Sequence, residues 1–335
     1  MGIFDESLDQ NEANFTVLSP VSFLRRAAQI YPQKIALVHG DRTLTWREVW
    51  HRSVAVACAL KARGIQRGDT VAILSANIPE MFEAHFAVPM CGGVLNAINI
   101  RLDPTTIAFS LDHGEAKMFV VDKEFGELAA AALKQVPADA LQVISIDDLQ
   151  LADGSLVSSD TWDTLIAEGQ GEADQIGMPY DALAFLPVDE WDAIALSYTS
   201  GTTGNPKGVV SHHRGAYLNA VSNALTWNMG DHPVYLWTLP MFHCNGWCFP
   251  WTLAVNAGTS ICLRQVRPKA VFEAISKHHV THFCGAPVVL NTLLSASGNL
   301  KQLIQHEVRV MTAGAAPPPA ILAGMQSLGV EVTHV

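Results

Sequence analysis

One segment, SYTSGTTGNPKGVV (197–210), concentrates residue types that bind phosphate. Its hydroxyl side chains can donate hydrogen bonds to an anion, and its glycines let backbone amides approach an anion closely. The predicted loop residues are Thr199, Ser200, Gly201, Thr202, Thr203, Gly204, Asn205, Pro206 and Lys207. The Lys207 ammonium adds a mobile positive charge for the outer phosphates. The segment therefore predicts a phosphate-binding loop that follows a buried strand.

The spacing within this loop differs from that of a P-loop NTPase. A Walker A motif has glycine, lysine and serine or threonine in direct succession at the start of a helix. Here Asn205 and Pro206 separate Gly204 from Lys207, and Gly208 follows the lysine. A flexible loop is predicted instead of a helix-anchored cradle. The alternative, a plain glycine-rich surface turn, does not explain so long a run of hydroxyl, glycine and lysine residues.

A second segment, PMFHCNGWCFPW (240–251), places a histidine after a predicted buried strand. A nearly neutral imidazole at His243 can donate a hydrogen bond to a carboxylate or to a phosphate that gains charge. A core histidine that bonds a backbone carbonyl is the alternative. His243 with Cys244 and Cys248 does not predict zinc, because the spacing fits no common zinc site and a second ligand pair is missing.

A third segment, VMTAGAAPPP (310–319), ends a predicted strand in small residues. Gly314, Ala315 and Ala316 would leave a flat slot in which backbone groups can face a planar ring, and Pro317 is predicted to start the next helix. An ordinary strand-to-helix turn is the alternative interpretation of this segment.

The elements that must position these residues alternate between short apolar strands and amphipathic helices, which predicts an α/β fold with parallel strands covered by helices. Strands are expected at 70–76, 118–122, 141–147, 193–200, 234–240, 259–264, 281–287, 308–314 and 330–335. Helices are expected at 79–92, 125–136, 161–169, 215–227, 268–279, 287–296 and 317–328. The rhythm weakens from Gln150 to Trp191, which predicts a surface excursion between two α/β subdomains, 1–190 and 191–335.

Composition limits the classes of protein to which the chain can belong. The 335 residues are 49% hydrophobic and carry a formal net charge of -11, which argues against a nucleic-acid partner. No apolar run is long enough to span a bilayer, and the acidic N-terminus lacks the basic start of a signal peptide. The six scattered cysteines are expected as free, reduced, buried thiols. A cytoplasmic protein is predicted.

The string YTSGTTGNPKGV resembles the signature of the adenylate-forming superfamily, which includes acyl-CoA synthetases, luciferases and the adenylation domains of peptide synthetases. LPMFHCNGW (239–247), TAGAAPPP (312–319) and residues 41–73 resemble further regions of that family in the same order. The resemblance implies the large N-terminal domain of that fold, with stacked mixed sheets and flanking helices. It also implies that the chain ends before this domain is complete and without the small C-terminal domain, so the full reaction is not expected from it alone.

The resemblance implies an ATP-dependent acid–CoA ligase of fatty acid metabolism, with ATP, CoA and a small carboxylic acid as substrates and Mg²⁺ as cofactor. Thr199 is the implied magnesium contact, Lys207 and His243 the implied catalytic residues, and His243, Trp247 and Gly314 the implied substrate contacts. The implied ATP contacts are residues 199–207 together with Gly314, Ala315, Ala316, Pro317 and His334.

Phe242 is followed by His243, where amino-acid-activating domains typically have aspartate, which favours an acid without an α-amino group. The run around His243 resembles that of ligases for short, medium and thioether acids, such as the methylmercaptopropionate ligases. Two alternatives stay open: an adenylation enzyme that passes its acyl group to a carrier protein, and a non-catalytic nucleotide-binding fragment. The sequence leaves the oligomeric state open, and a homodimer is one of the states compatible with it.

Overall fold

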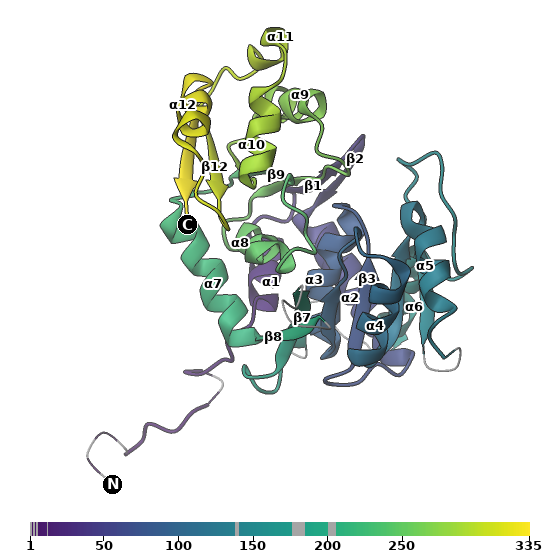
Figure 1. Ribbon diagram of the computed structural model, residues 1–335. Coiled ribbons are helices and arrows are strands. Elements are labelled where there is room, and N and C mark those ends of the chain that lie inside the picture. The colour runs from purple at the N-terminus through teal and green to yellow at the C-terminus, as the bar shows by residue number, and fades with distance from the viewer. Residues whose placement is uncertain are drawn as a thin grey trace.

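Two mixed β-sheets form the framework of the protein (Figure 1). The computed structural model describes residues 2, 4, 6–11, 13–137, 141–175, 185–199 and 206–335. Within these residues the predicted α/β class is confirmed, because helices alternate with strands along the chain and cover both sheets. In Figure 1, β9, β12 and the helices α9 to α12 lie above the block that holds β3, α4 and α6.

The first sheet has six strands in the order β6-β5-β3-β4-β7-β8. They are β3 (Thr70–Leu74), β4 (Val94–Ala97), β5 (Ala116–Asp122), β6 (Gln142–Ile146), β7 (Ala193–Thr199) and β8 (Lys207–His212). All neighbours are parallel except β8, which pairs antiparallel with β7 at the edge of the sheet. The carboxyl ends of the parallel strands therefore share one edge.

The second sheet has seven strands in the order β13-β12-β11-β9-β10-β1-β2. They are β1 (Ile35–His39), β2 (Arg42–Thr45), β9 (Val234–Leu236), β10 (Thr259–Ile261), β11 (His282–Cys284), β12 (Val308–Thr312) and β13 (Val330–His334). Only β2 runs antiparallel to its neighbour. The predicted division at residue 190 does not follow the sheets. The early strands β1 and β2 join the late ones here, and β7 and β8 join the first sheet.

The helices include all those expected from the pattern, together with others that the pattern did not predict, at 21–30, 46–62, 104–113, 249–255 and 298–301. They are α1 (Val21–Ile30), α2 (Trp46–Ala62), α3 (Pro79–Cys91), α4 (Pro104–His113), α5 (Gly126–Leu133), α6 (Trp162–Gln175), α7 (His213–Thr226), α8 (Phe249–Val255), α9 (Pro268–His278), α10 (Pro287–Leu294), α11 (Gly298–Lys301) and α12 (Pro319–Ser327). Short 3₁₀ turns occur at η1 (Lys123–Phe125) and η4 (Asn245–Cys248). The last helix begins two residues later than predicted, at Pro319 instead of Pro317.

Local sequence explains where the two central helices begin and end. A capping box starts α2, since the Thr45 hydroxyl accepts from the Glu48 amide while the Glu48 carboxylate accepts from the Thr45 amide. Pro79 opens α3, and Gly92 ends it with φ +88°, which glycine adopts without strain. Every residue of α3 is buried, as expected of a helix that lies inside the core.

The segment from Gln150 to Trp191 is more than the predicted surface excursion. Helix α6 is longer than expected and packs against α2, with Trp162 and Leu165 fully buried. The two helices approach closely at Gly169, where an added Cβ would lie 1.7 Å from the carbonyl oxygen of Ala55. Such a contact requires glycine, so this residue sets the distance between the helices.

Gly169→Ala and Gly171→Ala are expected to change stability in opposite directions although both lie in α6. The first must push α2 and α6 apart and should lower the free energy of unfolding by about 2 kcal/mol or more. An added Cβ at Gly171 meets nothing within 4 Å, so alanine should stabilise the helix by roughly 0.5–1 kcal/mol. Urea unfolding of both variants measures this, and equal changes would contradict the packing argument.

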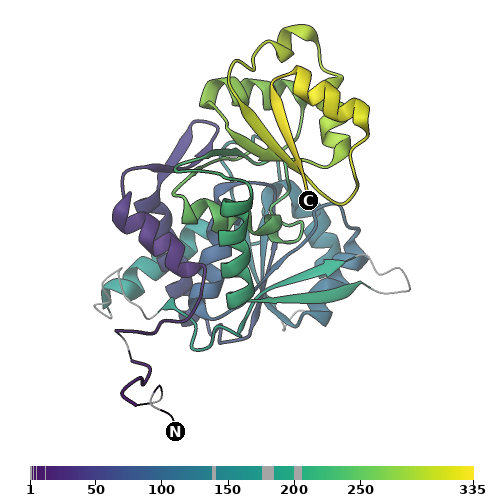
Figure 2. The ribbon, with the colours of Figure 1, turned by 90° about the vertical axis from the view of Figure 1, so that its left-hand side faces the viewer.

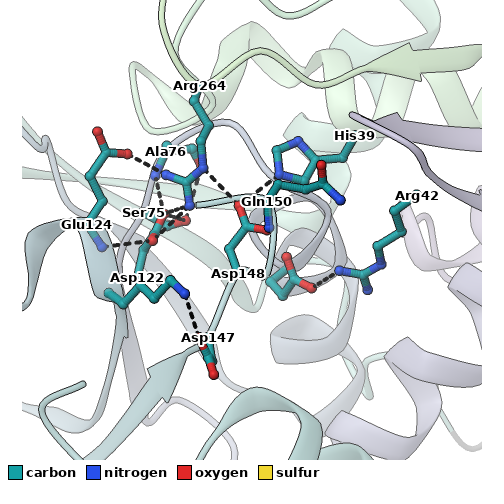
Figure 3. A network of polar contacts seen from close by, with 12 residues as sticks. His39, Arg42, Ser75, Ala76, Asp122, Glu124, Asp147, Asp148, Gln150 and Arg264 are labelled. Carbon is teal, nitrogen blue, oxygen red and sulfur yellow. Dashed lines mark hydrogen bonds and ion pairs between the residues drawn. The ribbon is translucent and has the colours of Figure 1, made fainter. Parts of the chain in front are cut away.

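An ion-pair network joins the two sheets (Figure 3). Arg264, just after β10, reaches across to Asp122 at 2.9 Å, to Asp148 at 2.8 Å and to Glu124. Asp148 also accepts from His39 Nε2 at 2.8 Å. Burial alone would raise the pKa of the Asp148 carboxyl. The bonds from His39, the Gln150 amide and Arg264 outweigh that effect and hold this pKa well below its usual range.

Candidate functional site

The carboxyl ends of the two sheets meet at Asn77, three residues after β3. Its Nδ2 donates to the carbonyl oxygens of Trp237 and Leu239 at 2.9 and 3.1 Å, and its Oδ1 accepts from the Met241 amide at 2.7 Å. These three groups belong to the segment that follows β9 in the other sheet. A buried carboxamide that uses its acceptor and donors in this way fixes the chain that carries His243.

The predicted phosphate loop begins and ends on an antiparallel hairpin, which Figure 2 shows extending from the lower part of the molecule. Thr199 is the last residue of β7 and lies opposite Lys207, the first residue of β8. Both are exposed. The structure therefore places the predicted hydroxyl and ammonium groups side by side. Lys207 belongs to a strand, so the part of the predicted flexible loop that follows Pro206 is regular structure. The remaining predicted loop contacts lie outside the described residues; they are Ser200, Gly201, Thr202, Thr203, Gly204 and Asn205.

A cavity of about 660 Å³ lies where the hairpin meets the segment after β9. His243, Cys244 and Phe242 line it on one side, and Ser197, Tyr198, Thr199 and Pro206 on another; the rest of its wall comes from Asn96, Ala97, Ile98, Asn99, Leu102, Thr106 and Ser110. The wall mixes apolar side chains with hydroxyl and amide groups. This is the chemistry of a small-molecule pocket, and it brings His243 and Thr199 to the same space.

Five consecutive residues after His243 adopt the left-handed conformation. Their φ angles are +42° at Cys244, +44° at Asn245, +55° at Gly246, +51° at Trp247 and +64° at Cys248. Left-handed backbone costs roughly 1–2 kcal/mol for each ordinary L-residue, so such a run persists only where its surroundings impose it. At Gly246 the turn leaves little room for a side chain, because a Cβ atom there would lie 3.1 Å from the Trp237 ring.

Two side chains from other elements hold this left-handed turn. Ser197 Oγ on β7 donates to Asn245 Oδ1 at 2.6 Å, and Asn223 Nδ2 on α7 donates to the Trp247 carbonyl at 2.8 Å. Trp247 itself is half-buried and packs against the main core, and it is not among the residues that line the cavity. Its predicted role in the substrate pocket stays a prediction.

The predicted ring-binding residues lie on the second sheet. Gly314, Ala315 and Ala316 follow β12 and are exposed, with Gly314 at φ +89°, while Pro317 is buried. His334 lies on β13 beside Thr312, at the same carboxyl edge, and is exposed. These residues lie at the edge where β9 also ends, and they do not line the 660 Å³ cavity, so their role in binding a ring stays a prediction.

Asn77, Asn96 and Asn245 were not predicted from the sequence. Asn96 lines the cavity, is 1% exposed, and neither end of its carboxamide has a hydrogen-bond partner in the described structure. A signal for all three was present, since each polar carboxamide stands inside or just after a buried apolar run. Sequence alone does not tell such a residue from an ordinary loop residue.

The cysteine expectation was partly wrong. Cys58, Cys91, Cys262 and Cys284 are buried as expected, whereas Cys244 is exposed and Cys248 is half-buried. All six are free. In the described part of the chain no cluster of three or more histidine, cysteine, aspartate or glutamate side chains is arranged to hold a metal ion. Nor does any helix there have the length and apolar character needed to cross a membrane.

Asn77→Ala is expected to unfold the junction between the two sheets. The variant leaves the Met241 amide and two carbonyls without partners in a buried site, which should lower the free energy of unfolding by about 2–4 kcal/mol. Urea unfolding, followed by tryptophan fluorescence, measures the change. The exposed Asn299 gives a control, because Asn299→Ala should change stability by less than about 0.5 kcal/mol. Similar losses in both variants would contradict the assignment.

Comparisons with known proteins agree on one group. The model of a family described as AMP-binding enzyme matches residues 24–335. The chain is 48% identical to peroxisomal acetate/butyrate–CoA ligase AAE7 of Arabidopsis thaliana and 46% identical to acetate–CoA ligase CCL3 of Humulus lupulus. Each alignment covers 98% of this chain, which spans 58% of the length of either relative.

A solved structure carries the same fold. The inhibitor-bound N-terminal domain of FACL13 from Mycobacterium tuberculosis has a TM-score of 0.76 and 25% sequence identity. The match covers 94% of this chain and 75% of that one. The expectation of the N-terminal domain architecture, with two mixed sheets and flanking helices, is thereby confirmed.

Proposed function

This chain belongs to the AMP-binding enzyme family, and we propose from that premise that it carries the adenylation site of an ATP-dependent acid–CoA ligase. The reaction would join a small carboxylic acid to CoA and convert ATP to AMP and pyrophosphate. The observation that carries the proposal is that His243 and Thr199 line one cavity, while Lys207 lies opposite Thr199 on the neighbouring strand. The names of the two plant relatives, both acid–CoA ligases, support it.

The chemistry of the first step follows from the groups at this cavity. An oxygen of the acid attacks the α-phosphorus of ATP, the bond to the bridging oxygen breaks, and pyrophosphate leaves. Lys207 offsets charge on the outer phosphates, and the loop hydroxyls and amides orient them. His243 donates a hydrogen bond to the attacking carboxylate or to the α-phosphate as its charge rises. Positioning and charge stabilisation account for most of the rate in reactions of this kind.

The donor set fits a magnesium ion only in part. Mg²⁺ prefers oxygen ligands and usually keeps several waters while it binds substrate phosphates through one or two protein groups. Thr199, with its exposed hydroxyl at the end of β7, is the described residue that would contact such an ion. When bound, the ion would neutralise phosphate charge. The metal would then be held chiefly by the nucleotide, and a magnesium titration of activity tests this.

In the second step the thiolate of CoA attacks the acyl carbon of the adenylate, a thioester forms, and AMP leaves. We propose a short- or medium-chain acid, or a thioether acid. His243 stands in place of a carboxylate that would hold an ammonium group, and the relatives are named for acetate and butyrate. An α-amino acid should therefore be a poor substrate.

Acid-dependent exchange of pyrophosphate into ATP tests the first step, with acetate, butyrate, a thioether acid and alanine compared at equal concentration. Exchange with one of the simple acids and none with alanine supports the proposal. Exchange with alanine, or failure of the chain to bind either ATP or a non-hydrolysable acyl-adenylate analogue in calorimetry, would overturn it. Binding without exchange would favour a nucleotide-binding fragment.

The acceptor is tested separately. Thioester formation with free CoA supports a CoA ligase, whereas transfer only to the phosphopantetheine arm of a carrier protein would favour the alternative acceptor. A cytoplasmic location and a homodimer stay predictions, and the name of one relative is peroxisomal. A fluorescent fusion and light scattering test them.

A further inference from the structure

We propose that Asn245 is a positioning residue that holds the His243 turn against the strand leading into the phosphate loop. The inference rests on the proposed function. Asn245 touches no predicted substrate group. It acts through Ser197, and the hydrogen bond between these two side chains sets the separation of the imidazole from the Thr199–Lys207 pair.

The contact joins two elements that are far apart in the chain. Ser197 Oγ donates to Asn245 Oδ1 at 2.6 Å across a sequence separation of 48 residues. Asn245 is 4% exposed, and its Nδ2 has no partner in the described structure. The Asn245 carboxamide is buried and its oxygen accepts this one side-chain bond, so the bond can fix the position of the turn relative to β7.

Each end of the bond lies two residues from a predicted site residue, which is Thr199 for Ser197 and His243 for Asn245. Ser197 and Thr199 lie on the same face of β7, since side chains alternate along a strand. Thr199 in turn pairs with Lys207 across the hairpin. On the other side, Asn245 lies two residues after His243, in the rigid left-handed turn. A shift at this bond therefore moves the phosphate-binding pair relative to the imidazole.

The backbone at Asn245 explains why asparagine suits the position. Its φ of +44° lies in the left-handed region, where asparagine and glycine are tolerated better than other residues. Asn245→Gly therefore tolerates the same backbone conformation and deletes the side chain that carries the carboxamide. Ser197→Ala deletes the other partner, and Ser197→Thr restores a hydroxyl on a residue that favours strands.

The experiment is a double-mutant cycle in acid-dependent ATP–pyrophosphate exchange. Asn245→Gly and Ser197→Ala should each lower kcat by about 10- to 100-fold with less than about a threefold change in KM for ATP, since misplacement by an ångström costs rates of this size. The double variant should be no slower than the worse single variant, and Ser197→Thr should recover most of the rate. Ser211→Ala, on the exposed strand β8, is the matched serine control and should behave as wild type.

Multiplicative losses in the double variant, a change in KM alone, or no loss in Asn245→Gly would overturn the proposal. Failure of the proposed function is separable, because the wild type would then show no exchange. In that case ¹⁵N NMR of the histidine rings gives the answer. The His243 resonances are assigned with His243→Ala. They should differ from those of the wild type in Asn245→Gly and in Ser197→Ala, and they should match the wild type in Ser197→Thr. Unchanged resonances in all variants would overturn the proposal.

Discussion

His243→Ala should lower the rate of acid-dependent ATP–pyrophosphate exchange by about 10²–10³-fold, the loss typical of removing one donor that faces developing charge. The KM for ATP should change little, because in the proposed reaction the imidazole acts on the reacting centre while the loop binds the phosphates. His243 is exposed at the wall of the cavity, so the variant should fold as the wild type does. Initial rates of exchange at saturating ATP measure kcat directly.

A second variant separates two roles of this imidazole. Glutamine keeps a neutral hydrogen-bond donor but cannot carry a positive charge. If His243 acts as a neutral donor, His243→Gln should retain about tenfold more activity than His243→Ala. Equal losses would assign a charged imidazole instead, and full activity in His243→Ala would contradict a catalytic role altogether. Melting curves for both variants should coincide with that of the wild type.

Arg264→Met should lower the free energy of unfolding by about 3–5 kcal/mol, because it leaves buried carboxylates without their cation. Asp122 is 0% exposed and Asp148 4% exposed, and both bind this guanidinium, as does Glu124 (Figure 3). Urea unfolding at pH 7 measures the loss. The stability of Arg264→Lys should lie between that of the wild type and that of Arg264→Met, since an ammonium keeps the charge but cannot reproduce three directed contacts. Arg267→Met, an exposed arginine three residues on, should change stability by less than about 0.5 kcal/mol.

The stability loss of Arg264→Met should depend on pH, and the direction of that dependence follows from Asp148. Its pKa is held below the usual value in the native protein, so its contribution to stability is present above the unfolded pKa of about 3.9 and is lost as the pH falls through the native pKa. Arg264→Met removes one of the groups that lower this pKa. The stability difference between wild type and variant should therefore shrink below about pH 4. A constant difference from pH 7 to pH 3.5 would contradict the role of Asp148.

Local patterns allowed much of this fold and site to be predicted. Alternating apolar strands and helices predicted the α/β class. Residue types in the 197–210 and 239–247 segments singled out Thr199 and His243, which line one cavity in the structure. Thr199 and Lys207 lie side by side because seven residues separate them and a hairpin brings their ends together. Information of this kind is contained within short stretches of chain.

Long-range partners could not be predicted in the same way. Asn77 bonds the Trp237 carbonyl 160 residues away, and nothing near either residue encodes that contact. The division at residue 190 failed to follow the sheets for the same reason, because alternation gives the strands but not their order. The left-handed turn after His243 was also missed, since Cys244, Trp247 and Cys248 are residues with little preference for it.

The left-handed turn has a consequence for protein chemistry. Four L-residues and one glycine there follow the mirror image of the helix that L-residues prefer, which is the helix natural to D-residues. A semisynthetic chain with D-alanine at the exposed Cys244 would fit this backbone better than one with L-alanine. The handedness of the backbone is thus reversed for one turn beside His243. A D-residue, which disrupts an ordinary right-handed helix, would lower the backbone strain at this turn.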